Sequence, residues 1–266
     1  MARVVYNVDL PVLLKIAVGY LKEGDDQVAI NRKNCQKGNL QRPENVKQFF
    51  FNIYSLGDAM NISEDQKRWV VIGIAFNKLV PHIRPFVEQS LQAEYQSLKS
   101  SHNIHIQTPP GFLRNHPKHL KYENINSNSS HKLSPFKFDF SKFDYKVSSH
   151  VDFAKLYLQP FMAKFSAFDG KCDGSAVLSL LVEVPVFSNA TQSSAKTVRE
   201  DVRNEWAHCN FTDWDTVKFQ GCFQEMRELV HSFALPTADE TTLLSELNDW
   251  ETKGMFLKLC YLKCLL

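Results

Sequence analysis

The longest amphipathic stretch of the chain covers residues 64–99, where apolar residues recur at intervals of three and four. This spacing predicts an α-helix with one apolar stripe facing a core. Ser63, followed three residues later by Gln66, is typical of a capped helix start. Pro81 and Pro85 each remove a backbone hydrogen bond, so we expect a kink or a break there. The stripe consists of Ile72, Phe76, Leu79, Ile83, Phe86, Val87, Leu91, Tyr95 and Leu98.

Helical periodicity returns after residue 150. Short connections join these segments and favour antiparallel neighbours, so the sequence predicts an all-α fold, an up-and-down helical bundle. Thr212 and Asp215 form a capping-box pattern before one of the helices. The expected helices cover residues 152–168, 174–184, 191–208, 213–233 and 238–250.

The remaining segments define the expected domain organisation. Residues 1–62 are interpreted as an N-terminal helical extension and residues 251–266 as a hydrophobic C-terminal tail, which leaves a domain over 63–250. Within it, residues 100–149 are rich in Ser, His and Pro and predict a long, polar, exposed insertion between the first long helix and the remaining helices. Alternating apolar and polar residues over 137–143 favour an edge strand in this insertion.

The composition is that of an ordinary globular protein. Of the 266 residues, 44% are hydrophobic and 23% are charged, which is enough for a substantial core. A net charge of +2 and a pI near 8.1 are too mild to indicate a nucleic-acid-binding protein, although a nuclease needs only a local positive patch. Lys196, Arg199 and Arg203 are spaced to form one, but the acids between them favour a solvated helix face instead.

The residues suited to metal binding are not arranged in a compact ligand set. The six cysteines contain no Cys-x2-Cys pair, which disfavours a zinc site, and we expect reduced, mostly buried thiols in a cytoplasmic protein. The apolar run over residues 10–21 is too short to span a bilayer, so no membrane association is expected. The histidines of the insertion fit no ligand spacing either, and we expect no metal and no cofactor: His102, His105, His116, His119 and His131.

The residues Arg203, Asn204 and His208 carry the most specific candidate chemistry. An arginine offers a planar, permanently charged fork that matches phosphate oxygens. A histidine has an unperturbed pKa of about 6.5 and can take and give a proton near neutrality. Together they are able to act on a phosphodiester without a metal. The alternative is a surface arginine and a histidine that interacts with the helix end.

The spacing of this pair constrains its geometry. Five steps along a straight α-helix leave Arg203 and His208 about 140° apart, so they do not converge on one phosphate. Two arrangements bring them together: the helix ends or unwinds near Ala207, or a second copy of the chain supplies the other half of the site. Either way, His208 is expected at a junction between two helices.

The surroundings of the pair resemble the HEPN superfamily (higher eukaryotes and prokaryotes nucleotide-binding domain), in the form found in DAZ-interacting zinc finger protein three. The resemblance is strongest over 151–250 and rests on the loop and helix FDGKCDGSAVLSLL over 168–181, the stretch VREDVRNEWAH over 198–208, and Trp214. The family signature is R-x(4–6)-H with Asn, Asp or His after the arginine, and Arg203, Asn204 and His208 match it.

The resemblance implies a metal-independent endoribonuclease whose site is built across a homodimer from Arg203, Asn204 and His208. Asp173 and Glu205 are candidates for supporting roles, although Asp173 is better explained as a helix cap. Trp206 and Trp214 are candidate platforms for stacking RNA bases, with packing between helices as the more economical role of Trp206. The alternative function is a non-catalytic dimerisation, adaptor or RNA-binding module that acts with protein partners in signalling or innate immunity.

Overall fold

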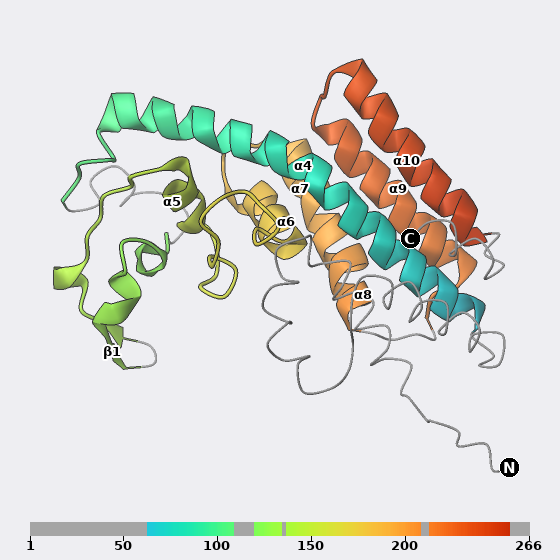
Figure 1. Ribbon diagram of the computed structural model, residues 1–266, viewed down its shortest axis with the longest axis horizontal. Coiled ribbons are helices and arrows are strands. Elements are labelled where there is room, and N and C mark those ends of the chain that lie inside the picture. Colours follow the sequence, from blue (N-terminus) through green and yellow to red (C-terminus); the bar gives the residue numbers. More distant parts are fainter. Residues whose placement is uncertain (1–62, 109–119, 135–136, 209–212, 256–266) are drawn as a thin grey trace, which may run out of the picture.

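The computed structural model describes residues 63–108, 120–134, 137–208 and 213–255. The expected N-terminal extension over 1–62 therefore lies outside the described residues, as does most of the expected tail. The described part is mostly helical, so the all-α fold class is confirmed at that level. Its elements surround one long helix, α4, which runs diagonally through Figure 1.

The helix α4 covers Glu64–His102 and starts as the sequence predicts. The Ser63 hydroxyl accepts a hydrogen bond from the Gln66 amide at 3.2 Å, while the Gln66 side chain accepts one from the Ser63 amide at 2.9 Å. The expected break is wrong, because the helix continues through Pro81 and Pro85. Both prolines lie on the exposed face, where water can hydrate the carbonyl groups that lose their partners.

The apolar side of α4 forms the centre of the core. It packs against α5 (His150–Lys155), α6 (Gly174–Glu183), α9 (Thr216–Ser232) and α10 (Thr237–Met255). By length and composition alone α4 would be able to cross a membrane, but 56% of its apolar window is buried inside the fold. Contacts with neighbouring helices therefore account for its apolar content. Trp69, Ile72, Ile83, Val87 and Leu91 are each at most 2% exposed.

The helix α5 is much shorter than the predicted helix over 152–168. It ends at Lys155, and turns lead from there to α6. Pro160 explains the difference, because a proline lacks an amide proton and disfavours the helical conformation of the residue before it. The spacing of apolar residues in this segment predicts one buried face; Phe153, Leu156 and Phe165 are buried, whereas Phe161 is 67% exposed because the helix does not continue to it.

The predicted helix over 191–208 forms as one helical run in three parts. It begins as α7 (Asn189–Thr197), continues as the π-helical segment η5 (Val198–Asn204) and ends as α8 (Glu205–Ala207). The next helix, α9, is capped by the Asp215 carboxylate, which accepts the Lys218 amide at 2.8 Å. The helix thus begins at Thr216 rather than at residue 213. Thr212, the expected cap, lies outside the described residues.

The helices α9 and α10 form a hairpin beside α4 (Figure 1). The tight turn between them places Ala234 in the left-handed region at φ 50°, directly after the expected end of the first of these helices at residue 233. The helix α10 continues to Met255, so the domain boundary expected at residue 250 falls inside a helix. The remaining tail residues, 256–266, lie outside the described residues.

The segment over 100–149 is only partly exposed. It contains the short turns η2 (Tyr122–Asn124), η3 (Asn128–His131) and η4 (Phe140–Lys142), and a small antiparallel pair of strands, β1 (Lys132–Ser134) and β2 (Lys137–Phe138). The predicted edge strand over 137–143 therefore starts where expected and ends early.

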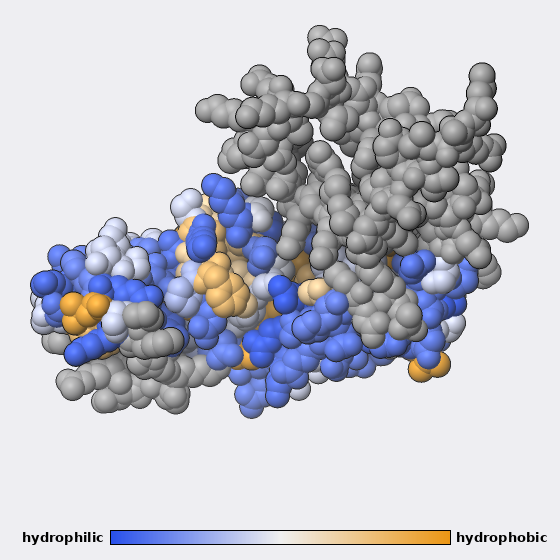
Figure 2. Space-filling view, turned by 90° about the horizontal axis from the view of Figure 1, so that it is seen from below, coloured by the Kyte–Doolittle hydropathy of each residue, from blue (hydrophilic) through white to orange (hydrophobic). Residues whose placement is uncertain are grey.

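Buried side chains tie this segment to the bundle. Ile104, Ile125 and Val147 are at most 2% exposed, so the expectation of a wholly exposed insertion is wrong. The buried Asn128 side chain donates to the Tyr122 carbonyl at 3.0 Å and accepts the Asp144 amide at 2.9 Å. The described atoms visible in Figure 2 are mainly hydrophilic, with smaller hydrophobic areas among them.

Candidate functional site

Arg203 and Asn204 lie at the end of the π-helical segment η5. Both are half-buried, and Arg203 Nη1 donates a hydrogen bond to Asn204 Oδ1 at 2.9 Å. Within the described residues no carboxylate lies within ion-pair distance of Arg203. Its guanidinium is therefore held by a neutral amide, and its positive charge is not cancelled by a paired acid.

His208 lies at the end of the same helical run. The helix α8 ends at Ala207, as the sequence predicts, and His208 is an exposed residue that caps it. The backbone is nevertheless in the right-handed helical region from Asn204 to His208, and the His208 amide still donates to the Asn204 carbonyl at 3.0 Å. Arg203 and Asn204 belong to η5, and the backbone from Asn204 to His208 keeps α-helical geometry.

The described residues show no direct interaction between Arg203 and His208. No hydrogen bond joins them in the part of the chain that the structure describes. The helix ends at Ala207, as the first of the two expected arrangements requires, but no contact between the described residues brings the two side chains together.

Trp206 is a packing residue at the contact between α8 and α4. Its indole stacks on Trp69 with ring centroids 5.5 Å apart and an interplanar angle of 18°. The Trp206 carbonyl accepts a hydrogen bond from Trp69 Nε1 at 2.9 Å. On α4, Gly73 leaves room for the indole, since a side-chain carbon at Gly73 would lie 2.5 Å from Trp206 Cε2.

Trp214 is buried in the core. It is 0% exposed, Arg68 on α4 donates to its carbonyl at 3.3 Å, and the Lys218 ammonium lies 4.8 Å from the ring centroid. A base cannot stack on Trp214 without opening the fold. Trp214 therefore offers no surface for RNA. Trp206 has the packing role that was the more economical of its two expected roles.

The two candidate supporting residues have other partners. The Asp173 carboxylate accepts the Ala176 amide at 3.0 Å and caps α6, which confirms the capping role. Glu205 is exposed and pairs with Lys218 on α9 at 3.0 Å. Glu205 thereby links α8 to α9 next to the helix end.

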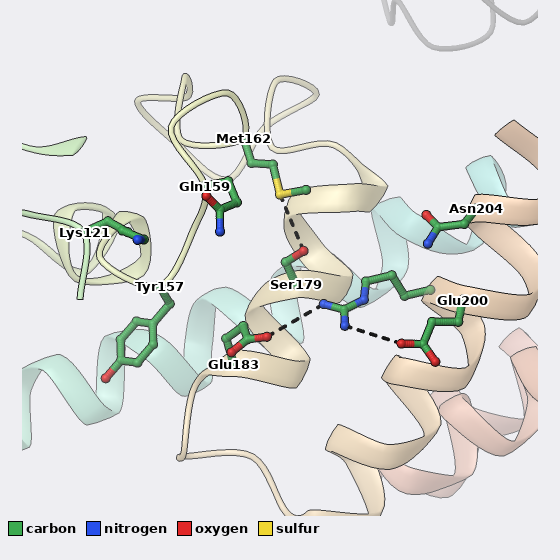
Figure 3. Close-up of a pocket in the computed structure, with 9 residues that line it drawn as sticks. Lys121, Tyr157, Gln159, Met162, Ser179, Glu183, Glu200 and Asn204 are labelled. Atoms are coloured by element: carbon green, nitrogen blue, oxygen red, sulfur yellow. Dashed lines mark hydrogen bonds and ion pairs between the residues drawn. The ribbon is translucent and has the colours of Figure 1, made fainter. Parts of the chain in front are cut away.

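Asn204 also lines a cavity of about 680 Å³. Figure 3 shows it between α6, the π-helical segment η5, and residues of the loops before and after α5. Three of its lining residues, Arg199, Glu200 and Asn204, come from η5. The others are Lys121, Tyr157, Gln159, Met162, Ser179 and Glu183.

The π-helical geometry explains how this cavity is lined. Arg199 and Asn204 are five residues apart and would face different directions on an α-helix. A π-helix forms hydrogen bonds between residues five apart, so such residues come to share a face. Arg199 is paired with Glu183 and with Glu200, in both cases at 3.9 Å, and thus belongs to this cavity rather than to a surface patch with Arg203.

Burial also sets the protonation of several groups. Burial, then the neighbouring Glu94 and Tyr122, raise the pKa of Tyr157, so its hydroxyl is neutral at physiological pH. On α9, burial followed by the charges of Asp201 and Glu228 raises the pKa of Glu225 to about 7. Glu225 Oε2 is buried with no hydrogen-bond partner among the described residues.

The described cysteines are free, buried thiols. Burial raises the pKa values of Cys172 and Cys222 to about 12, so neither is a reactive thiolate. This confirms the expectation of buried, reduced thiols for these two residues. Cys35, Cys209, Cys260 and Cys264 lie outside the described residues.

The described residues contain no group of three or more His, Cys, Asp or Glu side chains arranged to hold a metal ion. Comparisons with models of protein families, with curated proteins and with solved structures found no match to this chain. The resemblance to the HEPN superfamily thus remains a prediction from the sequence.

Proposed function

We propose that this chain is a HEPN-type domain that cleaves RNA without a metal, at a site completed by two copies of the chain. One observation carries the proposal. The half-buried Arg203 guanidinium is held by the neutral Asn204 amide, and the exposed His208 imidazole ends the same helix. A charged fork without a paired acid is suited to a phosphate, and an imidazole in contact with solvent is suited to proton transfer.

The chemistry follows from these two groups. The ribose 2′-hydroxyl attacks the adjacent phosphorus, the bond from phosphorus to the 5′-oxygen breaks, and a 2′,3′-cyclic phosphate remains. His208 moves the proton between these oxygens, a contribution of about 10²–10⁴-fold in rate. Arg203 stabilises the negative charge that develops on the phosphoryl oxygens. Asn204 holds the guanidinium in place.

Two chains are needed because of the direction of the side chains. Five steps along an ideal α-helix turn two side chains about 140° apart, and no hydrogen bond joins Arg203 and His208 among the described residues, so we assign the two groups at one phosphate to different chains. A twofold axis next to the end of α8 would place Arg203 of one copy opposite His208 of the other. The proposal therefore includes a homodimer with two equivalent sites.

The test is a cleavage assay on single-stranded RNA in the presence of a chelator. His208→Ala and Arg203→Ala are each expected to abolish cleavage while the far-UV circular dichroism spectrum is unchanged. His82→Ala, at an exposed histidine on α4, is the matched control and should cleave like the wild type. Cleavage that persists in both site variants would refute the mechanism.

A mixture of the two inactive variants tests the composite site. A heterodimer of Arg203→Ala and His208→Ala chains contains one site with both groups intact and one site with neither. Mixing the variants should therefore restore part of the activity. If both variants are inactive and the mixture also stays inactive, the site is not shared between chains.

The cleavage assay, together with the oligomeric state, distinguishes the nuclease from the alternative, a non-catalytic module. A chain that forms dimers but cuts no RNA would be a non-catalytic dimerisation or adaptor module, with signalling proteins as its partners. Size-exclusion chromatography with light scattering gives the oligomeric state that this comparison requires.

A further inference from the structure

The cavity beside Asn204 has no role in the cleavage mechanism. Its volume of about 680 Å³ is within the range of pockets that hold small ligands, about 300–1,000 Å³. In Figure 3, the polar ends of Lys121, Gln159 and Asn204 point toward its middle from three separate segments of the chain. Such convergence of side chains distant in sequence is typical of a binding site rather than of a surface depression.

The chemistry of the lining favours an uncharged group with both donors and acceptors. The two cations, Lys121 and Arg199, are balanced by Glu183 and Glu200, and Arg199 is already paired with both acids. The amides of Gln159 and Asn204 each offer a donor and an acceptor. Met162 adds an apolar wall. A phosphate would meet two carboxylates here, whereas the edge of a nucleobase matches the amides.

Ser179 provides a second polar contact on the wall formed by α6. It is only 6% exposed, and its hydroxyl donates to the sulfur of Met162 at 3.5 Å. A thioether sulfur is a weak acceptor, so this hydroxyl can exchange it for a better partner in the cavity at little cost. The buried wall of the cavity therefore also supplies a hydrogen-bonding group.

Asn204 connects the cavity to the proposed phosphate site. Its Oδ1 accepts the hydrogen bond from Arg203, and the same side chain lines the cavity. A group in the cavity would thus lie next to a phosphate bound by Arg203. In an RNA strand, the group next to a phosphate is the ribose and base of the adjoining nucleotide.

From this arrangement we infer that the cavity holds one unstacked base of the RNA strand, adjacent to the phosphate that Arg203 binds. The inference rests on the proposed function and adds a recognition element to it. Gln159, Ser179 and Lys121 contact the nucleotide in the cavity. Asn204 lies between this nucleotide and Arg203, to which it is hydrogen-bonded. Enzymes and binding proteins that act on single-stranded RNA commonly recognise bases that are turned out of the stack.

The test measures binding rather than cleavage. The 266-residue chain is titrated into a short, mixed-sequence RNA whose riboses are all 2′-O-methylated, so that the RNA cannot be cut, and fluorescence anisotropy reports the affinity. A matched series of these RNAs lacks the base at one position each. Gln159→Leu removes the amide from the cavity, and Gln89→Leu, at an exposed glutamine on α4, is the control.

Wild-type affinity should fall most for the RNA that lacks the base in the cavity. Gln159→Leu should lower the affinity for the intact RNA about tenfold, the effect of losing one hydrogen bond to a base. It should have no further effect on the RNA without that base, and Gln89→Leu should behave like the wild type. The loss of affinity caused by Gln159→Leu and the loss of affinity caused by removing the base then report the same contact.

Two results would overturn the inference. One is a Gln159→Leu variant that binds the intact RNA as tightly as the wild type. The other is a Gln159→Leu variant that loses the same affinity for every RNA in the series, which would show that the Gln159 amide contacts the RNA backbone. If the chain cleaves RNA in either case, only the base site fails; if it neither binds nor cleaves RNA, the proposed function fails as well.

Discussion

Among the glycines that the structure describes, Gly73 is the one where an added carbon would meet its neighbours most closely. Glycine within a helix normally costs about 0.5–1 kcal/mol relative to alanine, so Gly73→Ala would ordinarily stabilise α4. In this protein the added carbon would lie 2.5 Å from Trp206 Cε2 and 2.6 Å from Cζ2, and close to Nε1 as well. Carbon atoms pack at about 3.5–4.0 Å, so the indole must move by about 1 Å.

The indole has little room for this movement, because it also stacks on Trp69. Overpacking of this kind typically costs about 1–3 kcal/mol. After the gain in helix propensity, we expect Gly73→Ala to lower the free energy of unfolding by about 0.5–2 kcal/mol. Urea unfolding followed by far-UV circular dichroism measures this difference.

A second variant shows whether the contact with Trp206 is the cause. Trp206→Leu removes the ring atoms that Gly73 faces, so adding Gly73→Ala in that background should become stabilising by about 0.5–1 kcal/mol. Gly221→Ala on α9 is the matched control, because its added carbon meets no atom within 4 Å. It should stabilise the wild type by a similar amount. A Gly73→Ala variant that is stabilised in both backgrounds would refute the reasoning.

Two further predictions concern α9 and α6. The pKa of Glu225 is raised from 4.5 to about 7, so the folded state favours the neutral carboxyl and loses stability as the pH rises through this range. Glu225→Gln should therefore raise the free energy of unfolding by about 1–2 kcal/mol at pH of about 8, after allowance for solvent screening, and the gain should shrink as the pH falls toward 4.5. A gain that does not change with pH would contradict this. Asp173→Ala should cost about 1 kcal/mol by removing the cap of α6, whereas Asp173→Asn should keep both stability and RNA cleavage. Loss of cleavage in Asp173→Asn would instead place this carboxylate in the site.

The features that the sequence predicts correctly depend on local chemistry. The capping box at Ser63 uses two side chains within one turn, and the stripe on α4 follows from regular spacing. The end of α8 at Ala207 was likewise expected from the polar residues that follow it. Such features need no knowledge of the rest of the fold.

The features that were missed depend on tertiary contacts or on a single residue that overrides a pattern. Apolar spacing favours a helix through residue 168, but Pro160 prevents it. Pro81 and Pro85 do not break α4, because packing of the apolar side holds the helix together and the prolines face water. The polar composition of 100–149 hides the few residues, such as Ile104 and Val147, that are buried.

The π-helical segment η5 gives two residue pairs with the same spacing different surroundings. Arg199 and Asn204 are five residues apart, and so are Arg203 and His208. Only the first pair lies wholly within η5, and both of its residues line the cavity. The second pair begins in η5 and continues into α-helical geometry. The same spacing therefore has two settings within a single helical run: the first pair lines the cavity of one chain, and the second pair is the one for which we propose a second chain.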